Sequence, residues 1–340
     1  MLAELLRAAT ERPLTAREAE LAFTEVIEGR ATPVQMAALL VALRTRGPAP
    51  EEVAGGVRAL RRAMVPLPLP DGRPVVDTCG TGGGACATFN ISTAAAFVAA
   101  AGGAWVAKHG NRSFTSRCGS ADVLEALGVR LDLTPEEEAQ VLERARVVFM
   151  FAPLHHPAMR HVAPVRRELA MPTVMNLLGP LTNPARVRRQ VVGVADARLL
   201  DLVAHALVEL GHEHALVVHG EIGMDEMSPV GPTAVREVRN GAVRAWTFDP
   251  RALGWPEEPL DELAGGGPEE NAARVAAVLQ GRDGGIAVRA VAANAGAALY
   301  VAGCTPDLET GIRAAEDLLR RGAGWATFEA MRDAIAALRR

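Results

Sequence analysis

The stretch Asp77-Thr78-Cys79-Gly80-Thr81-Gly82-Gly83-Gly84, followed by Asn90-Ile91-Ser92-Thr93, decides how this chain is expected to fold. The residues at 75–77 predict a strand, and residues 92–101 predict a helix. A strand that enters a helix through a glycine loop is typical of a ligand-binding turn in α/β proteins, because glycine permits φ > 0 and the helix start offers free N–H groups to an anion. A plain glycine turn with Ser92 or Thr93 as helix cap has the same pattern. The stretch is neither Gly-x-Gly-x-x-Gly nor a phosphate-binding loop ending in Gly-Lys-Ser/Thr.

Beyond this stretch, short apolar runs alternate with helical patterns, which favours an α/β domain with a mostly parallel sheet over residues 71–340. Asn240-Gly241 predicts a β-hairpin within residues 235–247, interpreted as a peripheral insertion. The last 35 residues predict two amphipathic helices, the first capped by Thr305-Pro306. Further strands or buried-core runs are expected at 104–107, 147–151, 190–194, 215–219 and 286–288, and further helices at 120–127 and after Thr134.

Before the stretch, residues 1–65 show helical patterns only. Thr15 with Glu18 predicts a capping box, and Thr32-Pro33 predicts a second helix start. The proline-rich run at 66–70 ends the helical region. Residues 157–184 are helical and then broken by prolines, and we expect them to return and complete this small all-helical domain.

Composition excludes several classes of protein. The chain has 340 residues, 49% of them hydrophobic, and a net charge of −4, so no general basic field is available to hold nucleic acid. Its four cysteines form no Cys-x-x-Cys pair, which argues against a zinc site. The longest apolar stretch, 94–107, is shorter than the roughly 20 residues of a membrane span. We therefore expect a cytoplasmic protein without membrane or nucleic-acid partners.

A polar cluster follows the predicted strand 104–107 and includes Lys108, His109, Asn111 and Arg112. Lys108 is the chain's single lysine, since the other 35 of its 36 basic residues are arginine. Cations and hydroxyls at the carboxyl end of a strand suit a phosphate ester. A polar surface loop with a helix cap at Ser120 is the alternative.

Two further groups carry charge. Asp225 and Glu226 follow the predicted strand 215–219, where adjacent carboxylates can anchor Mg²⁺ or can simply be solvated. Arg166 lies on a predicted helix, where an arginine can clamp a carboxylate or form part of a cationic face.

Taken together, these motifs resemble the anthranilate phosphoribosyltransferase family over nearly the whole chain. The resemblance rests on the ordered motifs GTGG, NIST, KHGNRS, GSADVLEALG, VRREL (165–169), NLLGPLTNP (176–184) and GMDE. It implies a homodimer in which each chain has a small helical domain and a larger α/β domain of the nucleoside-phosphorylase type. It also implies transfer of the phosphoribosyl group of 5-phosphoribosyl 1-pyrophosphate to anthranilate, the second step from chorismate in tryptophan biosynthesis.

The resemblance also implies the site residues. Two Mg²⁺ ions per active site are implied, with Ser92, Asp225 and Glu226 as metal ligands, and anthranilate contacts are implied for Gly80, Asn111 and Arg166. The family commonly has Asp where this chain has Gly84, so only a backbone contact is expected there. Contacts to phosphoribosyl pyrophosphate are implied for Gly80, Gly83, Gly84, Thr88, Asn90, Ile91, Ser92, Thr93, Lys108, His109, Gly110, Asn111, Arg112, Ser113, Phe114, Thr115, Ser116 and Ser120.

No general acid or base is predicted, because the aromatic amine is already a neutral nucleophile. Two alternatives stay open. A pyrimidine-nucleoside-phosphorylase-like enzyme would need a free-phosphate site and a nucleobase pocket. A non-catalytic nucleic-acid-binding relative would be expected to be basic.

Overall fold

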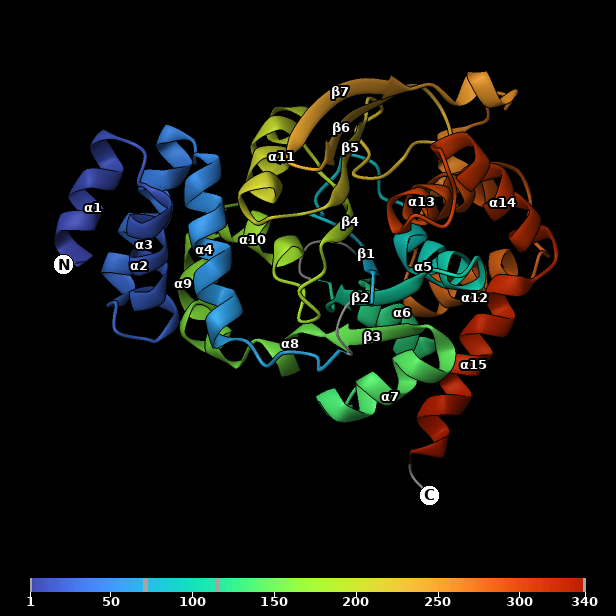
Figure 1. The fold of residues 1–340 in the computed structure, drawn as a ribbon, viewed down its shortest axis with the longest axis horizontal. Helices are drawn as coiled ribbons and strands as arrows, with labels where there is room; N and C mark the ends of the chain where they lie inside the picture. Colours follow the sequence, from blue (N-terminus) through green and yellow to red (C-terminus); the bar gives the residue numbers. More distant parts are fainter. Residues whose placement is uncertain (1, 70–72, 114–116, 339–340) are drawn as a thin grey trace.

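The N-terminal part of the chain is a bundle of four helices in a computed structural model that describes residues 2–69, 73–113 and 117–338 (Figure 1). The predicted caps are confirmed. The hydroxyl of Thr15 accepts from the Glu18 N–H at 3.2 Å, and that of Thr32 accepts from the Gln35 N–H at 3.2 Å. These bonds satisfy N–H groups that a helix start otherwise leaves unpaired. The helices are α1 (Leu2–Glu11), α2 (Ala16–Ile27), α3 (Pro33–Arg46) and α4 (Pro50–Ala63).

A seven-stranded sheet with the order β3-β2-β1-β4-β5-β6-β7 forms the centre of the larger domain. The first five strands of this order are parallel, and β6 and β7 are antiparallel. The predicted, mostly parallel sheet is therefore confirmed. The strands are β1 (Val75–Gly80), β2 (Trp105–Gly110), β3 (Val147–Phe151), β4 (Arg189–Gly193), β5 (His214–Gly220), β6 (Thr233–Arg239) and β7 (Ala242–Phe248).

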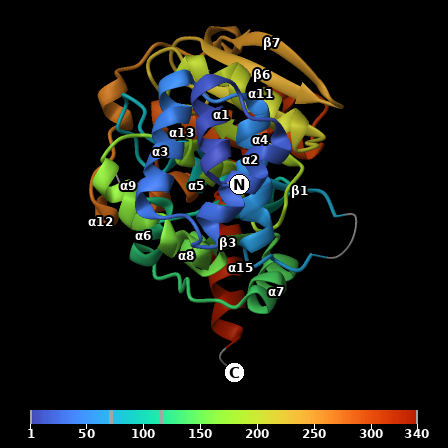
Figure 2. The same cartoon turned by 90° about the vertical axis from the view of Figure 1, so that its left-hand side faces the viewer.

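Helices cover both faces of the sheet (Figures 1 and 2). The α-helices after β1 are α5 (Ile91–Ala101), α6 (Ser120–Ala126), α7 (Pro135–Ala145), α8 (Ala152–His155), α9 (Ala163–Leu169), α10 (Met175–Leu181), α11 (Leu200–Glu209), α12 (Pro268–Leu279), α13 (Gly285–Ala302), α14 (Leu308–Arg320) and α15 (Ala323–Ala337). Short 3₁₀ turns are η1 (Pro157–His161), η2 (Ala197–Leu199), η3 (Pro250–Leu253) and η4 (Leu260–Leu263).

Alternation along the strands divides the hydrophobic core in two. Val191 and Leu216 join the cluster that contains α5, α13 and α15. Val192 and Val217 join the cluster that contains the N-terminal bundle and α11. Successive strand residues point to opposite faces, so the sheet separates the two clusters. α9 packs on α3 and α10 on α4, which places the segment 157–184 beside the N-terminal helices.

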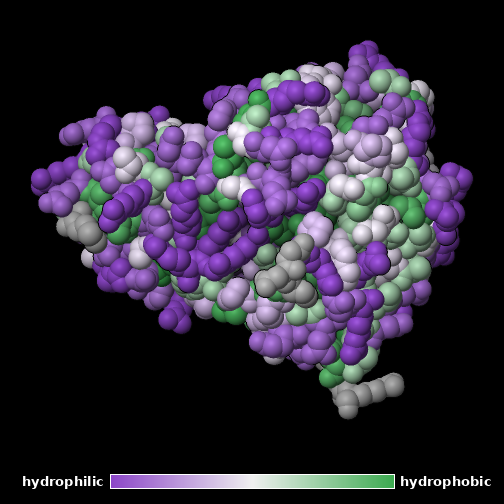
Figure 3. All heavy atoms as spheres, in the orientation of Figure 1, coloured by the Kyte–Doolittle hydropathy of each residue, from purple (hydrophilic) through white to green (hydrophobic). Residues whose placement is uncertain are grey.

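Three local expectations were incomplete or wrong. Residues 286–288 begin α13, which is long and apolar enough to cross a membrane but is 72% buried as a core helix. The hairpin β6–β7 is not separate from the sheet, because β6 pairs with β5 and extends it. The cap of α14 is Asp307, whose side chain accepts from the Thr310 N–H at 2.8 Å, and not Thr305-Pro306. On the face seen in Figure 3, apolar residues form only small groups among hydrophilic ones.

Candidate active site

Three stretches that are far apart in the sequence meet at the carboxyl ends of β1, β4 and β5. The Gly82 N–H donates to Oδ2 of Asp225 at 2.9 Å, and the Ser92 N–H donates to Oε1 of Glu226 at 3.0 Å. The glycine loop, the start of α5 and the acidic pair are thereby joined. A small cavity lies between them, lined by Thr78, Cys79, Ser92, Val191, Gly193, Val218, Asp225, Glu226 and Asn294.

The acidic pair carries more negative charge than its surroundings neutralise. Burial and the neighbouring Asp225 raise the pKa of Glu226 well above its usual value, and burial also raises the pKa of Asp225. Oε2 of Glu226 is buried and has no hydrogen-bond partner among the described residues. A cation beside this oxygen would offset the cost of burying the carboxylates and the repulsion between them. Two carboxylates and the Ser92 hydroxyl are the oxygen ligands that Mg²⁺ prefers, so the residues present fit this ion.

The described residues contain no group of three or more His, Cys, Asp or Glu side chains arranged to hold a metal. The pair would therefore provide only part of a coordination shell. Mg²⁺ usually keeps waters and takes substrate phosphate oxygens for the rest. This arrangement suits a metal that arrives with a phosphorylated ligand.

Lys108 on β2 contacts Thr78 and Ser92, two of the residues that line this cavity. Its side chain is only 4% exposed, and Nζ donates to the Thr78 carbonyl at 2.5 Å and to Oγ of Ser92 at 3.3 Å. Burial lowers its pKa, while Asp77 and Glu226 oppose that change. The ammonium group therefore lies directly at the start of α5.

Asp77 lies near Lys108 and interacts with it electrostatically. It was not predicted as a functional residue. It is fully buried, and Oδ1 accepts from the His109 N–H at 3.2 Å while Oδ2 accepts from Nε2 of Gln190 at 3.3 Å. Burial raises the pKa of Asp77. The only sequence signal was its place immediately before the glycine loop.

Close backbone approach explains two glycines at the acidic segment. A Cβ atom on Gly193 would overlap the carbonyl oxygen of Asp225. A Cβ on Gly80 would lie 2.7 Å from Oδ2 of Asp225. At Gly84, where the family commonly has Asp, a Cβ would lie 2.9 Å from the Gly223 carbonyl oxygen and 3.2 Å from Oδ1 of Asp225. Gly193 was missed at the sequence level, because nothing in its surroundings marks it.

The start of α5 is supported by a segment that the sequence did not reveal. Asn271 donates to Oδ1 of Asn90 at 2.9 Å, and Asn90 donates to the Cys118 carbonyl at 3.3 Å. Thr88 forms an isolated β-bridge with Ala264. Ile91 is buried in the core, and the buried hydroxyl of Thr93 has no hydrogen-bond partner in the part of the chain that the structure describes.

The described residues of the polar loop after Lys108 bond to α6. The Asn111 carbonyl accepts from the Ala121 N–H at 3.1 Å and from Oγ of Ser120 at 3.3 Å, which folds the loop back onto α6. Arg112 pairs with Glu125 at 2.6 Å, and no contact within the described ranges joins it to the acidic pair. The Ser113 N–H donates to Asp122 at 2.9 Å, and Gly110 lies against the Ser120 hydroxyl. Phe114, Thr115 and Ser116 lie outside the described residues.

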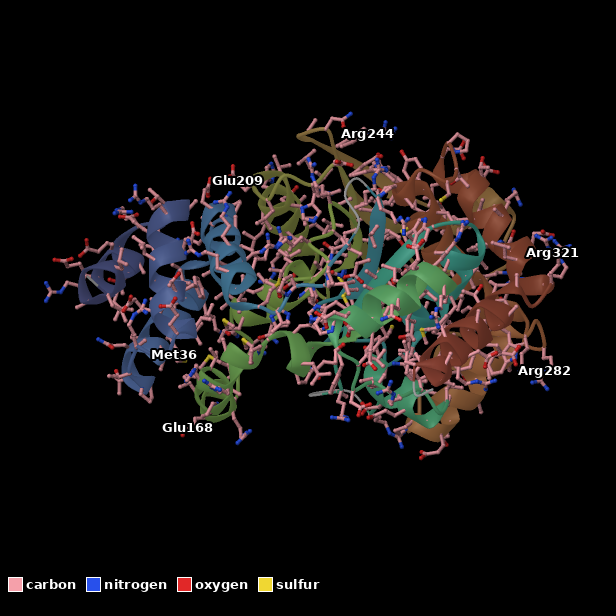
Figure 4. All side chains as sticks on the ribbon, turned by 60° about the horizontal axis from the view of Figure 1, so that its bottom comes forward. Met36, Glu168, Glu209, Arg244, Arg282 and Arg321 are labelled. Atoms are coloured by element: carbon pink, nitrogen blue, oxygen red, sulfur yellow. The ribbon has the colours of Figure 1, made fainter. Side chains whose placement is uncertain are left out.

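Arg166 is partly buried on α9, which packs on α3. Glu168, two residues further on, points away from the molecule in Figure 4, and residues two apart lie on roughly opposite sides of a helix. Burial lowers the pKa of Arg166, and no described carboxylate pairs with it. The guanidinium is thus free to take an anion.

Comparison with known proteins agrees with this architecture. Residues 2–64 match the helical bundle domain of a glycosyl transferase family, and residues 72–325 match the a/b domain of a glycosyl transferase family. The chain therefore has the two domains of a glycosyl transferase.

Individual relatives show which family of glycosyl transferases the chain resembles. The anthranilate phosphoribosyltransferase of Rubrobacter xylanophilus is 52% identical over 330 residues, which cover 97% of this chain and 96% of the relative. The crystal structure of anthranilate phosphoribosyltransferase from Thermus thermophilus superimposes with a TM-score of 0.92 at 46% identity, covering 99% of both chains. That of Saccharomyces cerevisiae, in complex with PRPP and Mg, has a TM-score of 0.88 at 26% identity and covers 99% of this chain and 98% of its own. The chain belongs to the anthranilate phosphoribosyltransferase family.

Proposed function

We propose that this chain transfers the phosphoribosyl group of 5-phosphoribosyl 1-pyrophosphate to the amine of anthranilate, releasing pyrophosphate, in the second step from chorismate to tryptophan. The observation that carries the proposal is that Asp225 and Glu226 bond to the N–H groups of Gly82 and Ser92, while the Lys108 ammonium donates to Oγ of the same Ser92. A buried carboxylate pair at the start of a helix, with an ammonium beside it, suits a polyphosphate that binds with a divalent cation.

The donor substrate is proposed to lie along the glycine loop and the start of α5. Gly80, Gly83, Gly84, Thr88 and the segment from Asn90 to Thr93 face the pyrophosphate. Lys108 and the loop from His109 to Ser116, with Ser120, surround the ribose and its phosphate. The Arg112 guanidinium pairs with Glu125, so it would have to release that carboxylate to bind the donor.

Ser92, Asp225 and Glu226 would hold magnesium, with two ions per active site when substrate is bound. The bound metal would neutralise charge on the departing pyrophosphate. The buried, unpartnered Oε2 of Glu226 supports this assignment. The acidic pair and Lys108 bring opposite charges to the start of α5, which suits a complex of a metal ion with a polyphosphate better than a free cation or a free anion.

The acceptor is proposed to lie near Gly80, Asn111 and Arg166. A guanidinium without an acidic partner can pair with the carboxylate of anthranilate through two parallel hydrogen bonds. Such a clamp would orient the ring and leave the amine directed at the ribose.

In the reaction, the bond from ribose C1 to the pyrophosphate oxygen breaks and a bond from C1 to the amine nitrogen forms. The leaving oxygen keeps the electron pair, and the amine loses one proton after the new bond is made. Because the aromatic amine is neutral near pH 7, positioning and electrostatics carry the catalysis, and no residue is assigned as general base.

We also propose a cytoplasmic homodimer without nucleic-acid or membrane partners. The net charge of −4 supports the absence of a nucleic-acid partner. The reaction itself requires neither the dimer nor a particular compartment.

Three parallel mixtures test the function and its alternatives. With anthranilate, phosphoribosyl pyrophosphate and Mg²⁺, we expect loss of anthranilate fluorescence. With a pyrimidine nucleoside and phosphate, we expect no phosphorolysis. With labelled DNA or RNA, we expect no retention at physiological salt. Activity in the second mixture alone, or binding in the third alone, would replace the proposal by the corresponding alternative.

A further inference from the structure

A buried pair of titratable side chains lies behind the site, and the proposed mechanism uses neither of them. Glu138 on α7 is 0% exposed and His155 at the end of α8 is 1% exposed. Nε2 of His155 lies 3.0 Å from Oε1 of Glu138. Burying an acid and an imidazole is costly unless they bond to each other.

The other nitrogen of the same ring fixes its orientation. Nδ1 of His155 lies 2.8 Å from the carbonyl oxygen of Val65, in the segment that leaves the N-terminal helices. A carbonyl can only accept, so Nδ1 carries a proton and donates it. The Val65 N–H donates back to the His155 carbonyl at 2.8 Å. The ring is therefore held at both ends.

One shared proton is enough to keep the remaining contact. Nε2 either accepts from a protonated Glu138 or donates to its carboxylate, and both arrangements preserve the bond. Burial raises the pKa of Glu138. Burial also opposes charge on His155, but the hydrogen bond from Glu138 raises the pKa of His155.

The ring of the next residue, His156, packs against His109 on β2. Its ring centroid lies 5.1 Å from that of His109, and Nε2 of each ring is buried without a hydrogen-bond partner among the described residues. Burial lowers the pKa of His109 well below its usual value and that of His156 to about 4. Two neutral imidazoles are thus held close together, each with one uncommitted nitrogen.

Strand geometry puts these rings on the face of β2 opposite to Lys108. Neighbouring residues of a strand point to opposite faces, so His109 points away from the face to which Lys108 reaches. His156 packs against His109 on this face, and the segment 157–184 that follows His156 along the chain includes Arg166. The pyrophosphate would therefore lie on the Lys108 side of the carboxyl end of β2 and the acceptor on the His109 side, with the ribose between them at that end.

We propose that Glu138 and His155 are positioning residues for the acceptor. By fixing the ring of His155 they fix the main chain at residues 155–156, and with it the separation of His156 from His109. This inference rests on the proposed function. Neither residue touches a substrate, so their effect should appear as a change in the affinity for one substrate only.

The chain contains a matched control. His214 on β5 and Glu237 on β6 form a second buried pair, 3.0 Å apart, with side chains 6% and 7% exposed. It lies towards the antiparallel edge of the sheet and, within the described residues, has no contact with His109 or His156. Glu237 also accepts from the Tyr300 hydroxyl at 2.7 Å and from Nε1 of Trp246 at 3.2 Å, so its loss should cost at least as much stability. If Glu138 only stabilises the fold, loss of either pair should affect the two KM values alike.

The test compares Glu138→Met, which keeps the length and removes the hydrogen bond, with Glu237→Met and with Glu138→Gln, whose amide can still donate to Nε2. Both Met variants should lower the Tm. Only Glu138→Met should raise the KM for anthranilate, by about tenfold, with the KM for phosphoribosyl pyrophosphate within about twofold, because a displacement below 1 Å already costs affinity and rate. Glu138→Gln should restore the anthranilate KM to within about twofold. In ¹⁵N-histidine NMR without substrates, the His109 and His156 signals should shift in Glu138→Met and not in Glu237→Met.

Several outcomes would overturn the inference: an unchanged anthranilate KM in Glu138→Met, a parallel rise of both KM values, or the same rise in Glu237→Met. If Glu138→Met does not fold, His155→Asn carries the same prediction, since its amide nitrogen takes about the place of Nδ1 and only the partner of Glu138 is lost. Absence of turnover in the wild type would refute the proposed function, and the NMR comparison would still decide whether Glu138 positions His156.

Discussion

The N–H of Gly82 donates a hydrogen bond of 2.9 Å to the carboxylate of Asp225, which lies 143 residues further along the chain. Glu226 makes the equivalent bond to the N–H of Ser92 at 3.0 Å. Each acid thus uses one oxygen to fix the glycine loop or the start of α5. Oε2 of Glu226 has no hydrogen-bond partner among the described residues, so the proposed metal site would adjoin the proposed phosphate site.

Replacing Asp225 and Glu226 by Ala should abolish most activity and remove its dependence on Mg²⁺. Without a cation, two buried carboxylates would repel a polyphosphate. The measurement is a Mg²⁺ titration of the initial rate in wild type and double variant. A wild-type titration curve in the variant would show that the metal is held elsewhere.

Lys108→Arg should lower kcat/KM for phosphoribosyl pyrophosphate by on the order of a hundredfold. Nζ lies 2.5 Å from the Thr78 carbonyl oxygen in a site that is 4% exposed, so a longer, planar guanidinium has no room without displacing its neighbours. The chain uses arginine at its other 35 basic positions, which suggests that this one needs the smaller ammonium. A stably folded variant within about threefold of wild type would mean that any cation suffices.

Arg166→Ala should raise the KM for anthranilate by roughly ten- to a hundredfold, because a charge-assisted hydrogen-bonded pair is worth about 1.5–3 kcal/mol. The KM for the donor substrate should change much less. Arg167→Ala, on the exposed side of the same helix, is the control and should leave both values near wild type. Equal losses for both substrates would assign Arg166 to folding or to a phosphate contact.

Gly193→Ala should be far more damaging than its size suggests. The added Cβ would overlap the Asp225 carbonyl oxygen, so the acidic segment would have to move. We expect activity to fall at least a hundredfold, with a weaker response to Mg²⁺. Gly267→Ala is the control, since nothing lies within 4 Å of a Cβ there. Near-normal activity of Gly193→Ala would contradict the observed approach of these two segments.

The buried His212 should make the fold sensitive to mild acid. Burial lowers its pKa to about 3, whereas in the unfolded chain it titrates near 6.5. The unfolded state therefore binds the proton first, and the contribution of His212 to stability is present above pH 6.5 and is lost as the pH falls. At pH 5 the loss should be about 2 kcal/mol. Denaturant unfolding at pH 7 and pH 5 should show that much extra loss in wild type relative to His212→Asn, and equal losses would refute the assignment.

Local signals predicted most of the fold. The caps at Thr15, Thr32 and Thr134 act within one helical turn, so the sequence displays them directly. Residues 286–288 misled because α13 is apolar on nearly all sides, which erases helical periodicity and leaves a short run that resembles a buried strand. The pairing of β6 with β5 is a long-range contact that no local pattern records.

The residues of the candidate site, too, were predicted only where a local motif marks them. Motifs with unusual residue types, such as the glycine loop and Asp225-Glu226, were recognised in the sequence. Asp77, Gly193, Asn271 and the Glu138–His155 pair were not, because their roles arise only when distant segments come into contact.

The most direct test of the account follows both products of one reaction. Purified protein is mixed with anthranilate and phosphoribosyl pyrophosphate, and anthranilate consumption and pyrophosphate release are measured over time with and without Mg²⁺. The account predicts one pyrophosphate released for each anthranilate consumed, and neither change without the metal. Pyrophosphate release without anthranilate consumption, or turnover that ignores Mg²⁺, would contradict it.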